Sequence, residues 1–183
     1  MNEKMPYRRI VLIGFKGSGK TTVGKLLARE AGFSFMDIDV LIEKEYTARR
    51  GARMNVRGIY KKFGREYFLK LEAGALRRAA KAQSVVISLG GGSPMNAGFG
   101  KQAFGKAAFV YLDVKPGTLY RRIVRMGIPP FFDKKAPRKS FKALYDERAP
   151  VYARIADVRA DNTRKKPERT CREIMDRLGG SDE

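Results

Sequence analysis

The sequence contains no histidine, no tryptophan and a single cysteine, Cys171. The lack of histidine excludes any mechanism that uses a histidine base or a histidine metal ligand. One cysteine excludes an internal disulfide and a cysteine-based zinc site. This cysteine usage is typical of a reducing compartment, and we expect a cytoplasmic protein.

Long apolar runs are also missing. No segment approaches the roughly 20 consecutive apolar residues that a membrane-spanning helix needs. The polar start, residues 1–9, lacks the apolar core of a signal peptide. We therefore expect no membrane partner.

Acidic residues are few, with 19 Asp and Glu against 39 Lys and Arg, a formal net charge of +20. This excess predicts an anionic partner, but the charge alone does not separate nucleic acid from nucleotides or acidic metabolites. A basic surface that only keeps the protein soluble is an open alternative. The length of 183 residues suits one compact domain, residues 1–183, which we expect to be monomeric.

The stretch from Gly14 to Thr21 reads Gly-Phe-Lys-Gly-Ser-Gly-Lys-Thr and follows the apolar run 10–13. It fits the phosphate-loop pattern of Gly, four residues, Gly, Lys and Ser or Thr between a strand and a helix. Glycines let backbone N–H groups turn toward phosphate oxygens, and the following helix presents its positive dipole end. A glycine-rich turn without a ligand is the alternative. The expected ATP-binding residues are Gly17, Ser18, Gly19, Lys20, Thr21 and Thr22.

Short apolar runs alternate with longer amphipathic segments along the chain. This succession predicts an α/β fold, a parallel sheet with helices on both faces, whose ligands lie at the carboxyl ends of the strands. A helix that begins near Val40 is expected to give way to a loop or ragged helix over 46–57. The other expected helices are 20–31, 65–82, 116–126, 140–154 and 167–178, and the expected strands are 9–13, 33–36, 85–89, 109–112 and 155–158.

Polar or glycine residues follow two of the expected strands. Asp37 and Asp39 end the second strand, and Gly90, Gly91 and Gly92 end the third. Two carboxylates at this spacing can face one metal ion and one substrate, and glycines let backbone N–H groups approach a substrate closely. A helix-capping Asp39 with an ordinary loop Asp37, and a plain tight turn at the glycines, are the alternatives.

The segment from Gly127 to Lys139 is rich in proline and strongly basic, and we expect neither helix nor strand there. Its charge would draw it toward bound phosphates, where closure would exclude water. The segment is thus interpreted as a lid, with an ordinary surface loop as the alternative. The acceptor-binding region is expected at about residues 40–82.

Together these motifs resemble those of shikimate kinases, in the same order, from about Arg9 to Pro167. They are the phosphate loop, Asp37-x-Asp39, Phe63-Gly64 with Phe68 and Glu72, Gly90-Gly91-Gly92, the proline-containing lid, and Glu147-Arg148-Ala149-Pro150-Val151-Tyr152. The resemblance implies a nucleoside monophosphate kinase-like P-loop fold with a five-stranded parallel sheet. It also implies transfer of the ATP γ-phosphate to the 3-hydroxyl of shikimate, in aromatic amino-acid biosynthesis.

The resemblance also assigns roles to residues. Lys20 would contact the transferred phosphate, and Thr21 and Asp37 would bind Mg²⁺, Asp37 through water. Asp39 would bind the acceptor hydroxyl and take its proton. Arg122 resembles the arginine that stacks on adenine, with a solvated arginine as the alternative. The substrate-binding residues implied are Asp39, Glu72, Gly90, Gly91, Gly92 and Arg148, with surface ion pairs as the alternatives for Glu72 and Arg148.

Two positions depart from the family pattern. Family members carry an arginine directly after the phenylalanine that matches Phe68, where this chain has Leu69. Family lids carry Arg-Pro-Leu-Leu, where this chain reads Pro129-Pro130-Phe131-Phe132. Lys70, Lys134, Lys135 and Arg138 are candidate replacements for the two substrate arginines.

Three functions stay open on the sequence alone. The first is a shikimate kinase with rearranged acceptor contacts. The second is a kinase of the same fold that acts on another small hydroxylated anion. The third is a nucleotide-binding or RNA-associated protein, although the chain lacks a recognisable RNA-binding motif, so nucleic acid is the least favoured partner.

Overall fold

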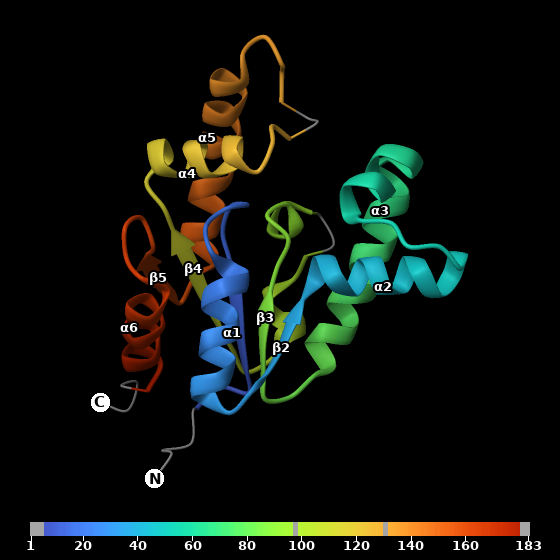
Figure 1. Cartoon of the computed structure of the whole chain (residues 1–183). Coiled ribbons are helices and arrows are strands. Elements are labelled where there is room, and N and C mark those ends of the chain that lie inside the picture. The colour runs from blue at the N-terminus through green and yellow to red at the C-terminus, as the bar shows by residue number, and fades with distance from the viewer. Residues whose placement is uncertain (1–5, 97–98, 130–131, 180–183) are drawn as a thin grey trace.

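The computed structural model describes residues 6–96, 99–129 and 132–179. Five parallel strands form one sheet in the order β2-β3-β1-β4-β5. The strands are β1 (Arg9–Ile13), β2 (Ser34–Asp37), β3 (Val85–Ser88), β4 (Ala107–Asp113) and β5 (Val158–Asp161). The predicted fold class, a five-stranded parallel sheet between helices, is therefore confirmed (Figure 1).

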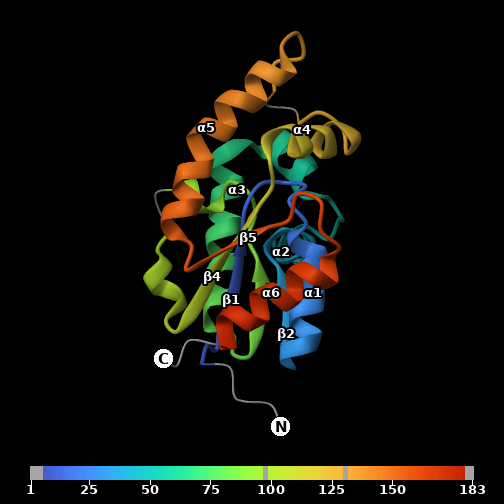
Figure 2. The same cartoon turned by 90° about the vertical axis from the view of Figure 1, so that its left-hand side faces the viewer.

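Helices cover both faces of the sheet and make two separate cores. Helices α1 (Lys20–Ala31) and α6 (Pro167–Gly179) pack on one face, where Leu27 and Ile174 belong to the same buried core as strand residues such as Leu12. Helices α2 (Ile38–Arg50), α3 (Val56–Lys81), α4 (Pro116–Arg125) and α5 (Pro137–Ile155) contribute to the core on the other face. Figure 2 shows the sheet nearly edge-on between α3 and α5 on one side and α1 and α6 on the other.

The central strand β1 is buried on both faces, as its unbroken apolar sequence predicts. Both β1 and α1 begin and end at the predicted residues. Helix α1 ends at Gly32, whose φ of 67° is the left-handed conformation that glycine tolerates at a helix end.

The region after β2 differs from the sequence prediction. The segment 46–57, predicted as a loop or ragged helix, is regular helix at both ends, because α2 continues to Arg50 and α3 begins at Val56. For α2 the reason is a buried stripe, Ile38, Ile42 and Tyr46, at a spacing of four residues, which keeps the helix packed until Gly51.

Helix α3 begins nine residues earlier than the predicted helix 65–82. The Asn55 side chain accepts a hydrogen bond from the Gly58 N–H at 2.8 Å and thereby caps the helix start. At Gly64 the backbone turns to a φ of 77°, which divides α3 into two helical halves. The predicted helix corresponds to the second half.

Two boundaries in the C-terminal third also differ. Helix α5 begins at Pro137, so residues 137–139 of the predicted lid are helical, because proline suits the first position of a helix. The last strand is β5 at 158–161 and not 155–158, because α5 continues to Ile155. Pro130 and Phe131 of the predicted lid lie outside the described residues.

The remaining segments are two short 3-10 turns, Ser93–Met95 and Lys101–Phe104, between β3 and β4. Within the described ranges, no helix is long and apolar enough to cross a membrane. The start of β1 and the end of α6 lie at the opposite end of the sheet from α4 (Figure 1).

Gly24 provides a stability test, because it sits inside α1 where the helix touches the sheet. A Cβ atom there would lie 2.5 Å from Cε2 of Phe35 and 2.9 Å from Cδ1 of Leu12. We expect Gly24→Ala to lower the free energy of unfolding by about 1–3 kcal/mol through overpacking. Thermal unfolding should show a Tm lower by several degrees.

The matched control is Gly179→Ala, because nothing lies within 4 Å of a Cβ at Gly179. Alanine normally stabilises a helix by about 1 kcal/mol relative to glycine. A Gly24→Ala protein at least as stable as the wild type would contradict the tight packing described here.

Candidate active site

The candidate site lies at the carboxyl ends of three neighbouring strands. The phosphate loop follows β1, Asp37 ends β2, and the triple glycine follows β3. These strands are adjacent in the order β2-β3-β1, and Asp37 pairs in register with Ser88. The sheet topology therefore brings the three sequence motifs together, where parallel sheets bind their ligands.

The phosphate loop has the backbone of an anion-binding turn. Gly14, Gly17 and Gly19 have φ values of 137°, 81° and 99°, which a side chain would strain. The Lys20 ammonium donates hydrogen bonds to the carbonyl oxygens of Gly14 and Phe15, each at 2.9 Å. Burial is the main cause that lowers the pKa of Lys20 to about 8; Asp39 and Asp37 oppose this shift, and nearby Lys16 adds to it. A bound phosphate would add negative charge beside this buried lysine and favour its charged form.

Asn162, which directly follows β5, holds the phosphate loop in place. The sequence interpretation did not identify this residue. Its side-chain amide donates to the Ser18 carbonyl at 2.7 Å, and its own carbonyl accepts from the Thr170 hydroxyl at 2.8 Å. A Cβ at Gly19 would lie only 2.5 Å from the Asn162 amide nitrogen. Position 19 therefore needs glycine for close packing as well as for its positive φ.

Arg122 lies beside the same loop on α4. Its guanidinium donates to the carbonyls of Gly17 at 3.3 Å, Asn162 at 3.1 Å and Thr163 at 2.9 Å. The solvated alternative for Arg122 is therefore wrong, because these three carbonyls fix the side chain at the outer edge of the phosphate loop.

Asp37 connects the phosphate loop to α2. One carboxylate oxygen accepts from the Thr21 hydroxyl at 3.0 Å, and the other accepts from the Asp39 N–H at 3.0 Å. The capping aspartate of α2 is thus Asp37, and Asp39 lies in the first turn of the helix. Burial and the neighbouring Asp37 raise the pKa of Asp39, and Lys20 and Lys16 oppose this.

Two cavities meet at Asp39. The first has a volume of about 350 Å³ and contains most of the predicted nucleotide and metal residues. The second has a volume of about 490 Å³ and contains the predicted substrate residues. Four residues line both cavities: Lys16, Asp39, Gly90 and Gly91. Of the predicted nucleotide residues, Ser18 and Arg122 line neither cavity, and both lie behind or beside the loop.

Glu72 lies buried in the wall of the second cavity, with 4% of its surface exposed. It accepts hydrogen bonds from the Ser93 hydroxyl at 2.7 Å and from the Asn96 amide. The surface ion pair considered for Glu72 is wrong, because Lys70 pairs with Glu66 at 2.9 Å instead. Burial and the nearby Asp39 raise the pKa of Glu72, although its hydrogen bonds oppose this.

Arg148 reaches the second cavity from α5. Its Nη1 lies 4.0 Å from where a Cβ of Gly92 would be, and its Nε is buried without a hydrogen-bond partner in the described part of the chain. The Tyr152 hydroxyl, one turn further along α5, donates to the Gly91 carbonyl. The helix therefore holds the glycine loop and offers an unsatisfied donor beside it.

Both departures from the family pattern, Leu69 and Pro129, line the second cavity. None of the candidate replacements Lys70, Lys134, Lys135 and Arg138 lines it among the described residues. Two arginines that the sequence interpretation missed do so, Arg57 and Arg65. No sequence motif identifies them, because their position depends on how α3 packs.

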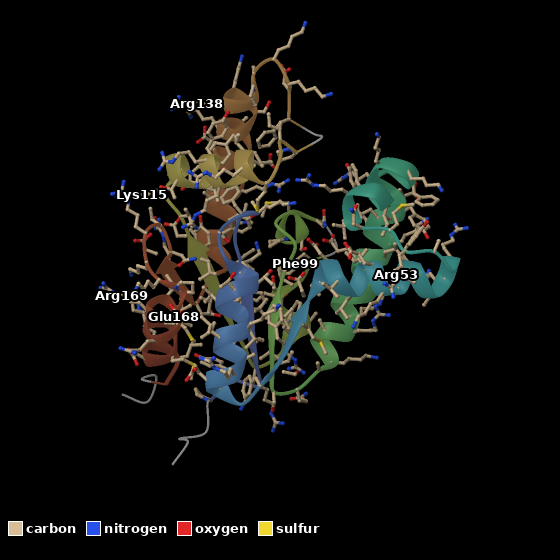
Figure 3. All side chains as sticks on the ribbon, viewed as in Figure 1. Arg53, Phe99, Lys115, Arg138, Glu168 and Arg169 are labelled. Carbon is tan, nitrogen blue, oxygen red and sulfur yellow. The ribbon has the colours of Figure 1, made fainter. Side chains whose placement is uncertain are left out.

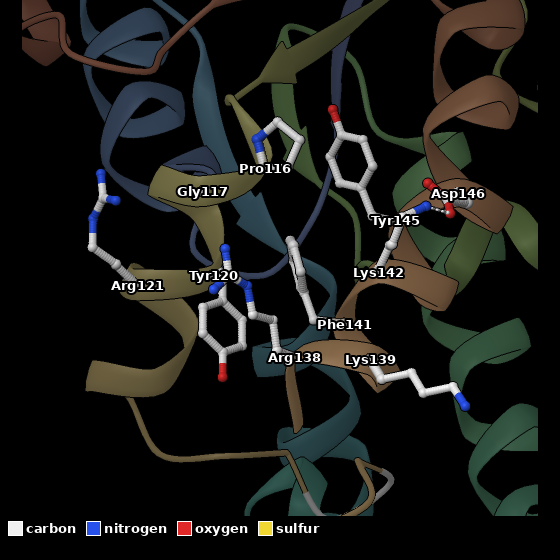
Figure 4. Close-up of a pocket in the computed structure, with 10 residues that line it drawn as sticks. All are labelled: Pro116, Gly117, Tyr120, Arg121, Arg138, Lys139, Phe141, Lys142, Tyr145 and Asp146. Carbon is white, nitrogen blue, oxygen red and sulfur yellow. Dashed lines mark hydrogen bonds and ion pairs between the residues drawn. The ribbon is translucent and has the colours of Figure 1, made fainter. Parts of the chain in front are cut away.

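A third cavity, of about 840 Å³, lies between α4 and α5 and shares no described residue with the other two. Figure 4 shows Tyr120, Phe141 and Tyr145 in its wall, with Arg138 extending toward Tyr120 and Lys139 pointing away. Arg138 thus belongs to a separate surface, which is why it cannot replace a substrate arginine in this structure.

The family model described as shikimate kinase matches residues 16–179. A shikimate kinase of Caldanaerobacter subterraneus is 36% identical over 168 residues, which cover 92% of this chain and 94% of the relative. A shikimate kinase of Moorella thermoacetica is 38% identical over 169 residues, 92% of this chain and 93% of the relative.

Solved structures give the same result. Shikimate kinase from Acinetobacter baumannii in complex with shikimate has a TM-score of 0.84 and 25% identity, and the match covers 97% of this chain and 96% of that one. Shikimate kinase from Aquifex aeolicus has a TM-score of 0.69 and 32% identity, over 94% and 96%. A gluconokinase from Sinorhizobium meliloti, at 17% identity and a TM-score of 0.54, shares the fold alone.

The lowered pKa of Lys20 predicts how nucleotide binding depends on pH. Lys20 is charged below about pH 8 in the free protein, and a bound triphosphate favours that charged form. Above this pH, binding must take up a proton, so the affinity for ATP should fall by up to about tenfold per pH unit. Isothermal titration calorimetry from about pH 7 to about pH 10 would measure the slope.

The comparison uses Lys20→Met, which should bind weakly and without this pH dependence, and Lys25→Met as the control. Lys25 is an exposed lysine on the same helix, so its variant should keep the wild-type slope. A wild-type affinity that stays constant over this range would show that Lys20 is not the titrating group.

Proposed function

This chain belongs to the shikimate kinase family, and from that premise we propose that it transfers the γ-phosphate of ATP to the 3-hydroxyl of shikimate. Members of this family are ATP-dependent phosphotransferases that act on a hydroxyl group. The observation that carries the proposal is the position of Asp39, where the nucleotide cavity meets the acceptor cavity.

The nucleotide side uses the phosphate loop. The loop N–H groups and the start of α1 face the phosphates, and Lys20 neutralises charge on the β and γ phosphates. Gly17, Gly19, Thr21 and Thr22 line this cavity, while Ser18 is buried beneath it. Arg122 supports the loop at the edge where we expect adenine.

Thr21 and Asp37 suit a magnesium ion. Their side-chain oxygens lie 3.0 Å apart, and oxygen is the ligand type that Mg²⁺ prefers. The described residues contain no group of three or more acidic, histidine or cysteine side chains that would enclose a metal. This fits an ion that takes few protein ligands and bridges to phosphates, where it would supply charge neutralisation.

On the acceptor side, Asp39 accepts the hydrogen bond of the reacting hydroxyl and takes its proton as the oxygen attacks the γ-phosphorus. The P–O bond to ADP breaks in the same displacement, and Lys20 stabilises the charge that develops. Glu72 orients substrate-binding groups through Ser93 and Asn96. Backbone N–H groups of Gly90, Gly91 and Gly92 approach the substrate, and Arg148 binds its carboxylate.

The segment 127–139 remains a proposed lid. Pro129 and Phe132 line the acceptor cavity, so its described ends already border the site. The single domain, the monomeric state and the cytoplasmic location expected from the sequence are likewise proposals.

The alternative acceptor is another small hydroxylated anion, which the altered residues Leu69 and Pro129 favour. Binding to nucleic acid has less support. The sequence has no recognisable RNA-binding motif, and in Figure 3 the labelled Arg53 lies on the opposite side of the molecule from Lys115 and Arg169.

The proposed function predicts ADP release that depends on shikimate. The purified protein with ATP and Mg²⁺ would be assayed with and without shikimate, beside a panel of other hydroxy acids and sugars that includes gluconate. Shikimate should give the highest kcat/KM of the panel. The Lys20→Ala variant should be folded but inactive. Binding of ATP without turnover of shikimate would reject the proposed acceptor and keep the nucleotide site.

Asp39→Asn tests the proton acceptor. Loss of a positioned base should lower kcat by about 10²- to 10⁴-fold, with the Kd for ATP changed only a few-fold, because Asp39 contacts the acceptor. Steady-state kinetics and calorimetry would measure both. Asp146→Asn, an exposed carboxylate paired with Lys142, is the control. A collapse of ATP affinity in Asp39→Asn would mean that the roles of Asp37 and Asp39 are wrongly assigned.

A further inference from the structure

One face of α3 forms a wall of the acceptor cavity. Arg65, Phe68, Leu69 and Glu72 all line it, and their spacing of three, four and seven residues is that of one helix face. Glu72 lies at the deep end beside Asp39, since a Cβ at Gly90 would lie 3.3 Å from Asp39 and 3.5 Å from Glu72. Arg65 lies two turns away, about 10 Å along the helix axis.

Among the residues that the structure describes, no polar contact explains the role of Arg65. Its side chain is exposed, and within the described ranges it makes no hydrogen bond or ion pair. The neighbouring charges satisfy each other, because Glu66 pairs with Lys70 at 2.9 Å. Arg65 also opens the second half of α3 after the break at Gly64, so the positive end of that helical segment adds to its charge.

Charged groups of both signs line the cavity. Asp39 and Glu72 lie at its deep end, with Lys16 near Asp39. Arg65 lines the cavity two turns away on α3, and Arg148 and Glu147 line it from α5. This pattern fits an acceptor that has a hydroxyl at one end and an anionic group at the other. A guanidinium that lacks a protein partner is free to form the planar, two-bonded contact that carboxylates accept.

Arg57 occupies a different place, the first turn of α3. Its guanidinium lies 3.4 Å from the Gly127 carbonyl, and its charge lowers the pKa of Lys16, although burial of Lys16 is the larger cause. Lys16 lines both cavities, and Arg57 lines the acceptor cavity. Arg57 thus lies near the junction of the nucleotide and acceptor cavities, across which the phosphoryl group would pass.

We propose that α3 supplies the acceptor-side cations of this enzyme: Arg65 binds the acceptor carboxylate together with Arg148, and Arg57 stabilises the phosphoryl group during transfer. This inference rests on the proposed function and names the groups that replace the arginines absent at Leu69 and Pro129. The two roles predict different kinetic effects.

Arg65→Ala tests the carboxylate contact. Its KM for shikimate should rise about 10- to 150-fold, which corresponds to the loss of one charge-assisted hydrogen-bonded pair. The KM for ATP should stay within about twofold. The methyl ester of shikimate, which has no negative charge, should be a poor substrate of the wild type, and Arg65→Ala should handle the ester almost as well as the wild type does.

Arg77→Ala is the matched control, because Arg77 is an exposed arginine on the same helix outside the cavity. Arg65→Lys should recover part of the lost affinity for shikimate, since the charge remains while the planar fork is lost. If Arg65→Ala behaves like Arg77→Ala, or lowers kcat/KM equally for shikimate and its ester, the carboxylate role is overturned while the proposed function stands. A wild type inactive with shikimate would overturn both.

Arg57→Ala tests the phosphoryl role. It should lower kcat at least tenfold with little change in the KM for shikimate, because the contact forms only as charge develops on the phosphoryl group. Arg53→Ala, an exposed arginine just before the same helix, is the control. A kcat equal to that of Arg53→Ala, or a loss confined to the KM for shikimate, would overturn this role.

Discussion

Parallel pairing of β1 with β3, and of β3 with β2, is the constraint on which the site depends. Strands that run in the same direction end at the same edge, so three separated sequence motifs arrive at one place. This strand pairing alone is enough to bring together the phosphate loop, the Asp37–Asp39 pair and the triple glycine. Two residues that are distant in the sequence hold these motifs in place. Asn162 donates a hydrogen bond to a backbone carbonyl of the phosphate loop, and Tyr152 donates one to a carbonyl of the triple glycine.

Charge at the junction of the two cavities is balanced only in part. Burial lowers the pKa of Lys20 to about 8 despite the nearby Asp39 and Asp37, while the pKa of Asp39 rises through burial and the nearby Asp37. Burial disfavours the charged form of both groups, and the attraction between Lys20 and Asp39 opposes both shifts. A bound phosphate would favour the charged form of Lys20 and so offset the cost of burying this ammonium group.

Much of the fold could be predicted from the sequence, because local patterns mark where its strands and helices begin and end. The limits of β1 and α1 are as predicted, since an apolar run, a glycine loop and an amphipathic helix follow each other without ambiguity. The extension of α2 was missed because only one more buried residue, Tyr46, continued its stripe. The hydrogen bonds of Asn162 and the cavity positions of Arg57 and Arg65 depend on tertiary packing, and no local pattern reports them.

Our proposal for Arg65 concerns a helix face and not a single position of the family motif. The family arginine that matches Leu69 would lie on one face of α3. A side chain one turn earlier on that face can reach the same cavity. Leu69 carries no charge, but Arg65 stands four residues before it and lines the same cavity. What the chemistry requires is a cation of suitable geometry within reach of the substrate, and the helix offers more than one position from which to supply it. The absence of an arginine at Leu69 is therefore compatible with a complete acceptor site, since the positive charge of Arg65 lies one helical turn away.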